Sequence, residues 1–118
     1  MASRRKEQQE DAKLRLLQIL SNNPQMTTRE IARKVGISNG SAYYLLTSLI
    51  DKGFVKLANF KKSDQKIKYS YLLTPKGIRE KSTIAQRFIF RKKKEYDALR
   101  EEIISLEKSI GNNFDNYE

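Results

Sequence analysis

The sequence predicts a mainly α fold with one small β-hairpin and a long carboxyl-terminal helix. Three observations support this prediction. Apolar residues recur with helical spacing in several segments, residues 54–74 contain two alternating stretches, and one long helical pattern runs from Pro75 to Gly111. A chain of 118 residues, 38% of them hydrophobic, is sufficient for one small domain and an added element.

Two helices are expected before Gly36. Residues 7–22 place apolar side chains among charged ones at helical spacing, and the sequence SNNP then ends the pattern. Thr27 followed three residues later by Glu30 has the form of a capping box, which predicts a short helix over about 28–35. Gly36 stands where a helix commonly ends with a positive φ.

A third helix, a hairpin and a final helix are expected after Gly36. Ser38 is the expected N-cap of a helix over about 38–52, which Gly53 closes. Residues 54–60 and 68–74 alternate like strands, and the polar loop between them lacks Asn-Gly and Asp-Gly, so we expect a longer, mobile tip. Pro75 suits the first turn of a helix that continues to about residue 110.

This element order is that of a winged helix-turn-helix, in which the second helix of the pair enters the major groove of DNA. Residues 1–75 are therefore expected to form a DNA-binding domain, with a recognition helix at about 38–52 and a wing at about 54–74. Residues 76–110 would form a dimerisation helix, and residues 111–118 a flexible tail.

The expected recognition helix has two different faces. One arc of about 100° contains Ala42, Leu45, Leu46 and Leu49, which favours burial. The opposite face carries short polar and aromatic side chains in place of the Lys and Glu of a purely structural helix. Asn can pair with adenine, Ser and Thr can contact bases, and Gly permits close approach. The residues expected to read bases are Ser38, Asn39, Gly40, Ser41, Tyr43, Tyr44 and Thr47.

The two tyrosines have a second interpretation. Tyr43 and Tyr44 could be amphipathic fillers at the edge of the domain, each packing on a neighbour while exposing its hydroxyl. Asp51, on the same side, faces phosphate unfavourably and suits a surface position near the end of the helix.

The charge distribution favours a polyanion as partner. The formal charge is +10, and residues 1–94 contain 22 Lys and Arg against 7 Asp and Glu, whereas residues 95–118 contain 2 against 7. A charge run is usually only a solvated surface, but four lysines in residues 61–68, with one acid among them, exceed what solubility requires. The residues expected to contact the DNA backbone are Thr27, Thr28, Arg29, Arg33, Lys34, Lys61, Lys62, Lys66 and Lys68.

The carboxyl-terminal helix carries an apolar heptad seam. Such a stripe could dock on the chain's own core, but residues 95–110 follow a complete winged helix and leave no apolar segment unassigned, so self-association is the simpler outcome. A dimer would hold two recognition helices about one DNA turn apart on a pseudo-palindrome. The flanking charges leave parallel and antiparallel pairing open, with antiparallel preferred. The expected interface residues are Ile89, Tyr96, Leu99, Ile103, Leu106 and Ile110.

Composition argues against catalysis. The chain contains no cysteine and no histidine, so it has no disulfide, no thiolate metal site and no imidazole base. We expect no catalytic residues, no metal and no cofactor, although composition does not exclude an Asp/Glu site for Mg²⁺. No secretion signal or run of about 18 apolar residues is recognisable, which predicts a cytoplasmic protein.

The residues also resemble a known family. LRLLQILSNNPQMTTREIARKVGISNGSAYYLLTSLIDKGFVK followed by YLLTPKG resembles the winged helix-turn-helix core of the MarR family of bacterial transcriptional regulators. With RFIFRKKKEYDALREEI included, the chain is similar to the small exopolysaccharide-associated subgroup of that family over residues 10–108. The resemblance implies a cytoplasmic, dimeric, DNA-binding regulator, most simply a repressor, encoded near exopolysaccharide genes and associated with the nucleoid when bound.

Two features depart from the MarR pattern. Typical members carry an Asp-x-Arg pair at the wing tip, whereas this chain has Asp64, Gln65 and Lys66 there, so lysine contacts would replace arginine insertion into the minor groove. One long helix in place of a multi-helix dimer domain gives no support for a small-molecule effector. A protein-interaction module and an RNA-binding regulator are the alternative functions.

Overall fold

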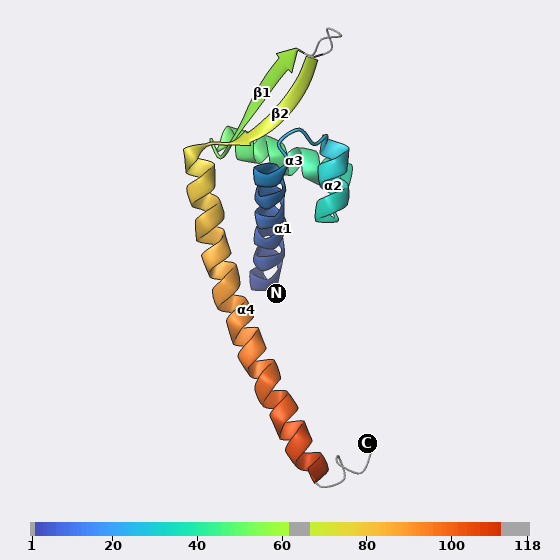
Figure 1. Ribbon diagram of the computed structural model, residues 1–118, viewed down its shortest axis with the longest axis vertical. Helices are drawn as coiled ribbons and strands as arrows, with labels where there is room; N and C mark the ends of the chain where they lie inside the picture. The colour runs from blue at the N-terminus through green and yellow to red at the C-terminus, as the bar shows by residue number, and fades with distance from the viewer. Residues whose placement is uncertain (1, 62–66, 112–118) are drawn as a thin grey trace. The chain divides into compact units, whose positions relative to one another are not determined.

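The predicted fold class is confirmed. The computed structural model describes residues 2–61 and 67–111, with the side chains of residues 4–58 and 70–111. The chain divides into two compact units, Met1–Ala85 and Gln86–Glu118. The elements along the chain are α1 (Ala2–Asn22), α2 (Thr28–Val35), α3 (Asn39–Asp51), β1 (Val55–Lys61), β2 (Ile67–Leu73) and α4 (Pro75–Ile110) (Figure 1).

Three side-chain hydroxyls begin the helices that follow α1. The Thr27 hydroxyl accepts a hydrogen bond from the backbone N–H of Glu30 at 3.1 Å, as the capping box predicts. Ser38 and Thr74 likewise accept from the N–H three residues later, at 3.1 and 3.0 Å. Gly36 ends α2 with φ 84°, a conformation that costs a residue with a side chain more than glycine.

The first helix is longer than predicted. It begins at Ala2, five residues before the expected start at residue 7. Residues 2–6 contain no Gly or Pro, and Ala, Arg and Lys are strong helix formers. They also contain no apolar side chain larger than alanine, so the periodic pattern that marks the rest of α1 gives no signal there.

The core of the first unit lies where α1, α2 and α3 meet the base of the hairpin. Each helix contributes one apolar face, and α2 packs beside α3 (Figure 1). Ile84 brings the first three turns of α4 into the same unit. No described helix is long and apolar enough to cross a membrane. The buried apolar residues are Leu14, Leu16, Leu17, Leu20, Met26, Ile31, Ala32, Val35, Ala42, Leu46, Leu49, Val55 and Ile84.

The hairpin is antiparallel, and its register runs from the pair Val55 and Leu73 to the pair Lys61 and Ile67. Residues 62–66 therefore connect the strands, which confirms that the connection is longer than a two-residue turn. The expected mobile tip falls on these residues and lies outside the described part of the chain, as do residues 112–118 of the expected tail.

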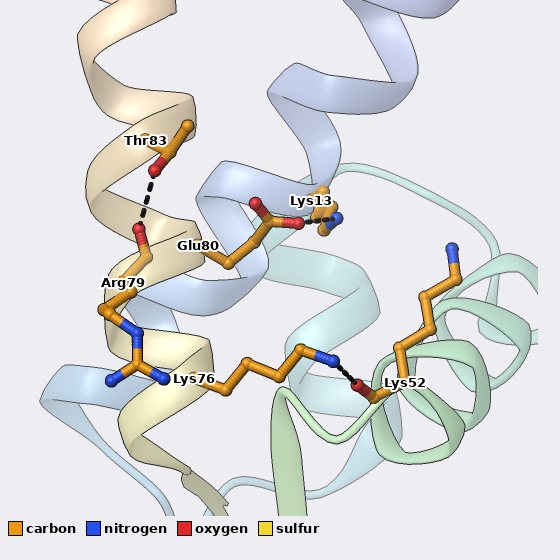
Figure 2. Close-up of polar contacts among 6 residues, drawn as sticks. All are labelled: Lys13, Lys52, Lys76, Arg79, Glu80 and Thr83. Atoms are coloured by element: carbon orange, nitrogen blue, oxygen red, sulfur yellow. Dashed lines mark hydrogen bonds and ion pairs between the residues drawn. The ribbon is translucent and has the colours of Figure 1, made fainter.

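The start of α4 is fastened to the turn between α3 and β1. The Thr74 hydroxyl donates to the Gly53 carbonyl at 2.5 Å. The Lys76 ammonium donates to the Lys52 carbonyl at 2.9 Å, as Figure 2 shows. Gly77 lies so close to Phe54 that a Cβ added there would be 1.9 Å from the Phe54 carbonyl oxygen. The LTPKG sequence thus provides a cap, a cation and a position without a side chain at this junction.

An ion pair connects α1 with the same part of α4. The Lys13 ammonium lies 3.0 Å from a Glu80 carboxylate oxygen, and both side chains are mostly buried (Figure 2). Lys13 and Lys76 also lie over the Phe54 ring, 4.8 and 5.0 Å from its centroid. These contacts orient the first turns of α4 within the first unit.

Candidate nucleic-acid interface

The buried face of α3 determines which face is presented to a partner. Ala42, Leu46 and Leu49 are buried, and Leu45 is half-buried. The opposite face is exposed, with Tyr43 at 67% and Tyr44 at 77% of full exposure. All seven residues predicted to read bases are exposed, so the structure leaves them accessible and their role stays a prediction.

Local hydrogen bonds define what the amino end of α3 offers. The Ser38 hydroxyl donates to the Ser41 hydroxyl at 2.9 Å while it accepts from the Ser41 N–H, so the two serines are joined by two hydrogen bonds. The Thr47 hydroxyl donates to the Tyr43 carbonyl at 2.8 Å. Thr47 therefore presents its methyl group and its oxygen lone pairs to a partner, and no free donor.

Gly40 is not required by packing or backbone conformation. A Cβ added there would meet no atom within 4 Å, and its φ is not positive. Glycine in a helix is less favourable than alanine by roughly 0.5 to 1 kcal/mol. Packing within the described fold therefore does not require glycine at this exposed position of α3, and the role of Gly40 in base reading stays a prediction.

The predicted backbone-contacting residues of α2 lie at both ends of the helix, with Thr27, Thr28 and Arg29 at its start and Arg33 and Lys34 in its last turn. Thr27, Arg29, Arg33 and Lys34 are exposed, and Thr28 is half-buried. The free N–H groups and the positive end of the helix dipole favour phosphate at the start of α2, beside Thr27, Thr28 and Arg29. The assignment of these residues to DNA contact stays a prediction.

Sequence reasoning missed Tyr71. Its hydroxyl lies 3.4 Å from the Thr28 hydroxyl, and its N–H donates to the Pro24 carbonyl at 3.0 Å, so β2 is connected to the start of α2. Strand alternation could place Tyr71 on one face of the hairpin but could not reveal that this face meets α2. The contact sets the position of the wing relative to the helix pair.

The wing lysines divide into two groups. Lys61 and Lys68 lie in β1 and β2, where the strand pairing is described but the side chains are not. Lys62 and Lys66 lie outside the described residues. Among the described wing side chains, Lys56 is an exposed cation on β1 that the sequence-based assignment did not include.

The predicted dimer seam is exposed along the second unit. Its six residues range from 41% exposure at Ile110 to 65% at Tyr96. These residues stay a predicted interface. Within the described parts of the chain, no group of three or more acidic side chains is arranged to hold a metal ion.

The chain is similar to known DNA-binding proteins. Residues 9–56 match the family described as winged helix-turn-helix DNA-binding. A PadR-like transcriptional regulator from Bacillus cereus strain ATCC 14579 is 19% identical, with a TM-score of 0.65 over 74% of this chain and 89% of that one. A MarR family transcriptional regulator from Silicibacter pomeroyi is 23% identical, with a TM-score of 0.58 over 87% and 71%. Sso10a-2, a DNA-binding protein from Sulfolobus solfataricus, is 22% identical, with a TM-score of 0.56 over 83% and 94%.

No curated protein sequence matches the chain. The fold is nevertheless that of winged helix-turn-helix regulators, MarR proteins among them, so the resemblance stated from the sequence is confirmed at the level of the fold.

Proposed function

We propose that the protein is a sequence-specific, double-stranded DNA-binding transcriptional regulator. The observation that carries the proposal is the exposed face of α3, where Asn39, Gly40, Ser41, Tyr43 and Tyr44 stand opposite the buried leucines. Short polar side chains read base edges at close range, and Gly40 lets the backbone approach. The match of residues 9–56 to a winged helix-turn-helix DNA-binding family supports the same function.

The regulator would act as a homodimer through α4. The exposed heptad seam supports this part of the proposal, and two recognition helices would then bind a pseudo-palindromic operator. Repression by occupancy of the operator is the simplest mechanism. The sequence resemblance to the exopolysaccharide-associated subgroup supports control of exopolysaccharide genes by a cytoplasmic, nucleoid-associated protein. The proposed function involves no catalysis, no cofactor and no small-molecule effector.

Selection of bound sequences from a random duplex library tests the proposal. The expected result is one enriched half-site with a defined spacing and two-fold symmetry. Fluorescence anisotropy on the selected duplex and on random duplex should then show specific binding at least about 10³-fold tighter, with both affinities falling steeply as salt rises. Failure to enrich any sequence, with no salt-dependent binding to random duplex, would refute it.

The two alternatives give different results. A protein-interaction module would show absent or salt-independent binding to duplex, because its basic charge would be incidental. An RNA-binding regulator would release labelled duplex DNA when structured RNA is added at equal concentration. The proposed function requires the duplex to remain bound.

A further inference from the structure

Three cations share one face of α4 at the start of the second unit. Residues 87–94 contain five Lys and Arg and no acid. Within this segment Arg87, Arg91 and Lys94 stand at positions i, i+4 and i+7, which fall within an arc of about 60° around a helix. At about 1.5 Å per residue they span about 10 Å along its axis. These three residues are called the cationic stripe below.

The cationic stripe lies on the face of α4 opposite the heptad seam. The seam residues are centred about 150° around the helix from the stripe, so a partner on the seam leaves the stripe accessible. The next acid along the chain is Glu95, whose carboxylate accepts a hydrogen bond from the Lys92 ammonium at 3.0 Å. Lys92 lies on the seam side of the helix, so this ion pair uses a cation outside the stripe.

Aromatic rings hold two of the three cations of the stripe. The Arg91 guanidinium lies 5.4 Å from the centroid of the Phe88 ring, and the Lys94 ammonium lies 4.5 Å from the centroid of the Phe90 ring. Phe90 is itself 63% exposed, so this ring and its cation are both accessible to a partner. Such contacts restrict long side chains, so less rotamer freedom is lost when the cations bind an anion.

The arrangement of apolar residues in this segment favours a nucleic-acid backbone over a membrane surface. A helix that lies on a membrane separates a wide apolar face from its basic face. Here Phe88, Ile89 and Phe90 are successive residues, so they point in directions about 100° apart and cations occupy the directions between them. Each strand of duplex DNA carries one phosphate per about 3.4 Å of axis, or about three over the length of the stripe.

We propose that the cationic stripe of Arg87, Arg91 and Lys94 binds backbone phosphates of duplex DNA, in addition to the contacts of the winged helix. The inference rests on the proposed DNA-binding function and adds a second contact surface to it. Arginine suits this role because its guanidinium can donate two parallel hydrogen bonds to one phosphate. Every DNA sequence has the same backbone, so the stripe raises the affinity for all duplexes by the same factor and reads no bases.

Neutralising the stripe in the full chain tests the proposal. One variant combines Arg87→Gln, Arg91→Gln and Lys94→Gln, and fluorescence anisotropy measures its affinity for the selected duplex and for random duplex over a range of salt. The slope of log affinity against log salt should decrease by about 2 to 3, because each phosphate contact contributes about 0.9 to it. At about 0.1 M salt both affinities should fall by the same factor, at least about tenfold.

Two matched variants control for net charge and for packing. Lys93→Gln, Arg100→Gln and Lys108→Gln together remove the same charge from exposed positions of α4 outside the stripe, and the salt slope should then stay within about 1 of the parent value. Arg87→Lys combined with Arg91→Lys keeps the charge of the stripe and should keep the parent slope. Circular dichroism and light scattering should show the same helix content and the same oligomeric state for every variant.

The outcomes distinguish this inference from the proposed function. A parent protein that binds no duplex would refute the proposed function and the stripe with it. A parent with a steep salt slope and a stripe variant with the same slope would overturn the inference alone, as would equal losses in the stripe variant and the charge-matched control. Binding of the parent to phosphatidylserine vesicles that the stripe variant lacks, with an unchanged slope on duplex, would assign the stripe to a membrane and overturn the inference.

Discussion

Two glycines in the first turns of helices should respond oppositely to the same substitution. Gly77 is the third residue of α4, and a Cβ there would lie 1.9 Å from the Phe54 carbonyl oxygen. Gly40 is the second residue of α3, and a Cβ there would meet no atom within 4 Å. Alanine has a higher helix propensity than glycine at both positions, so any difference in stability between the two variants comes from packing.

The expected magnitudes follow from these contacts. Gly77→Ala must displace the Phe54 backbone, at a cost of about 1 to 3 kcal/mol for overpacking. The Thr74 N–H donates to the same Phe54 carbonyl at 3.1 Å, so its displacement weakens this bond, worth about 1 kcal/mol. After a helix-propensity gain of up to about 1 kcal/mol, we expect a net destabilisation of about 1 to 4 kcal/mol. Gly40→Ala should raise the free energy of unfolding by about 0 to 1 kcal/mol.

Thermal unfolding followed by circular dichroism measures both variants. The concentration of protein must be the same in every sample, because the Tm of the proposed dimer would depend on concentration. For a domain of this size, each 1 kcal/mol shifts the Tm by roughly 4 to 8 °C, so Gly77→Ala should unfold well below the parent protein. A Gly77→Ala variant as stable as the parent, or a Gly40→Ala variant as unstable as Gly77→Ala, would refute the reasoning.

Three further variants test the predicted DNA contacts and the predicted dimer seam, each with its own measurement. Tyr44→Ala should lower specific affinity roughly tenfold while leaving random-duplex affinity nearly unchanged, and normal operator binding by anisotropy would show that the reading face is misassigned. Lys62→Ala combined with Lys66→Ala should weaken binding to all duplexes and reduce the slope of log affinity against log salt by about 2, whereas an unchanged slope would remove these lysines from the phosphate contacts. Ile103→Asp places a charge in the predicted seam and should yield monomers by light scattering, and a persistent dimer would place the interface elsewhere.

Local signals predicted most of the fold. The Thr27 and Ser38 caps and the positive φ of Gly36 depend on residues adjacent in sequence, so they could be recognised without tertiary information. The early start of α1 at Ala2 was missed because its first turn contains no large apolar side chain that could reveal a period.

Contacts between distant residues could not be predicted in the same way. Tyr71 reaches Thr28 across 43 positions, and Lys13 pairs with Glu80 across 67. A one-dimensional pattern shows which face a side chain occupies, but it does not show which other element meets that face. Position 77 also could not be predicted from local sequence, because it requires glycine through its closeness to the Phe54 carbonyl and not through a turn.

The sequence by itself determined the element order, the caps, the two faces of α3 and the heptad spacing of α4. These features arise from local periodicity and from hydrogen bonds between neighbouring residues. The tertiary structure alone decided that β2 joins α2 through Tyr71 and that α4 is held by Phe54 and by Lys13 of α1. It also decided that a Cβ would fit at Gly40 but not at Gly77. The physical reason is that such contacts depend on how close two separately folded segments approach, which packing of the whole core sets.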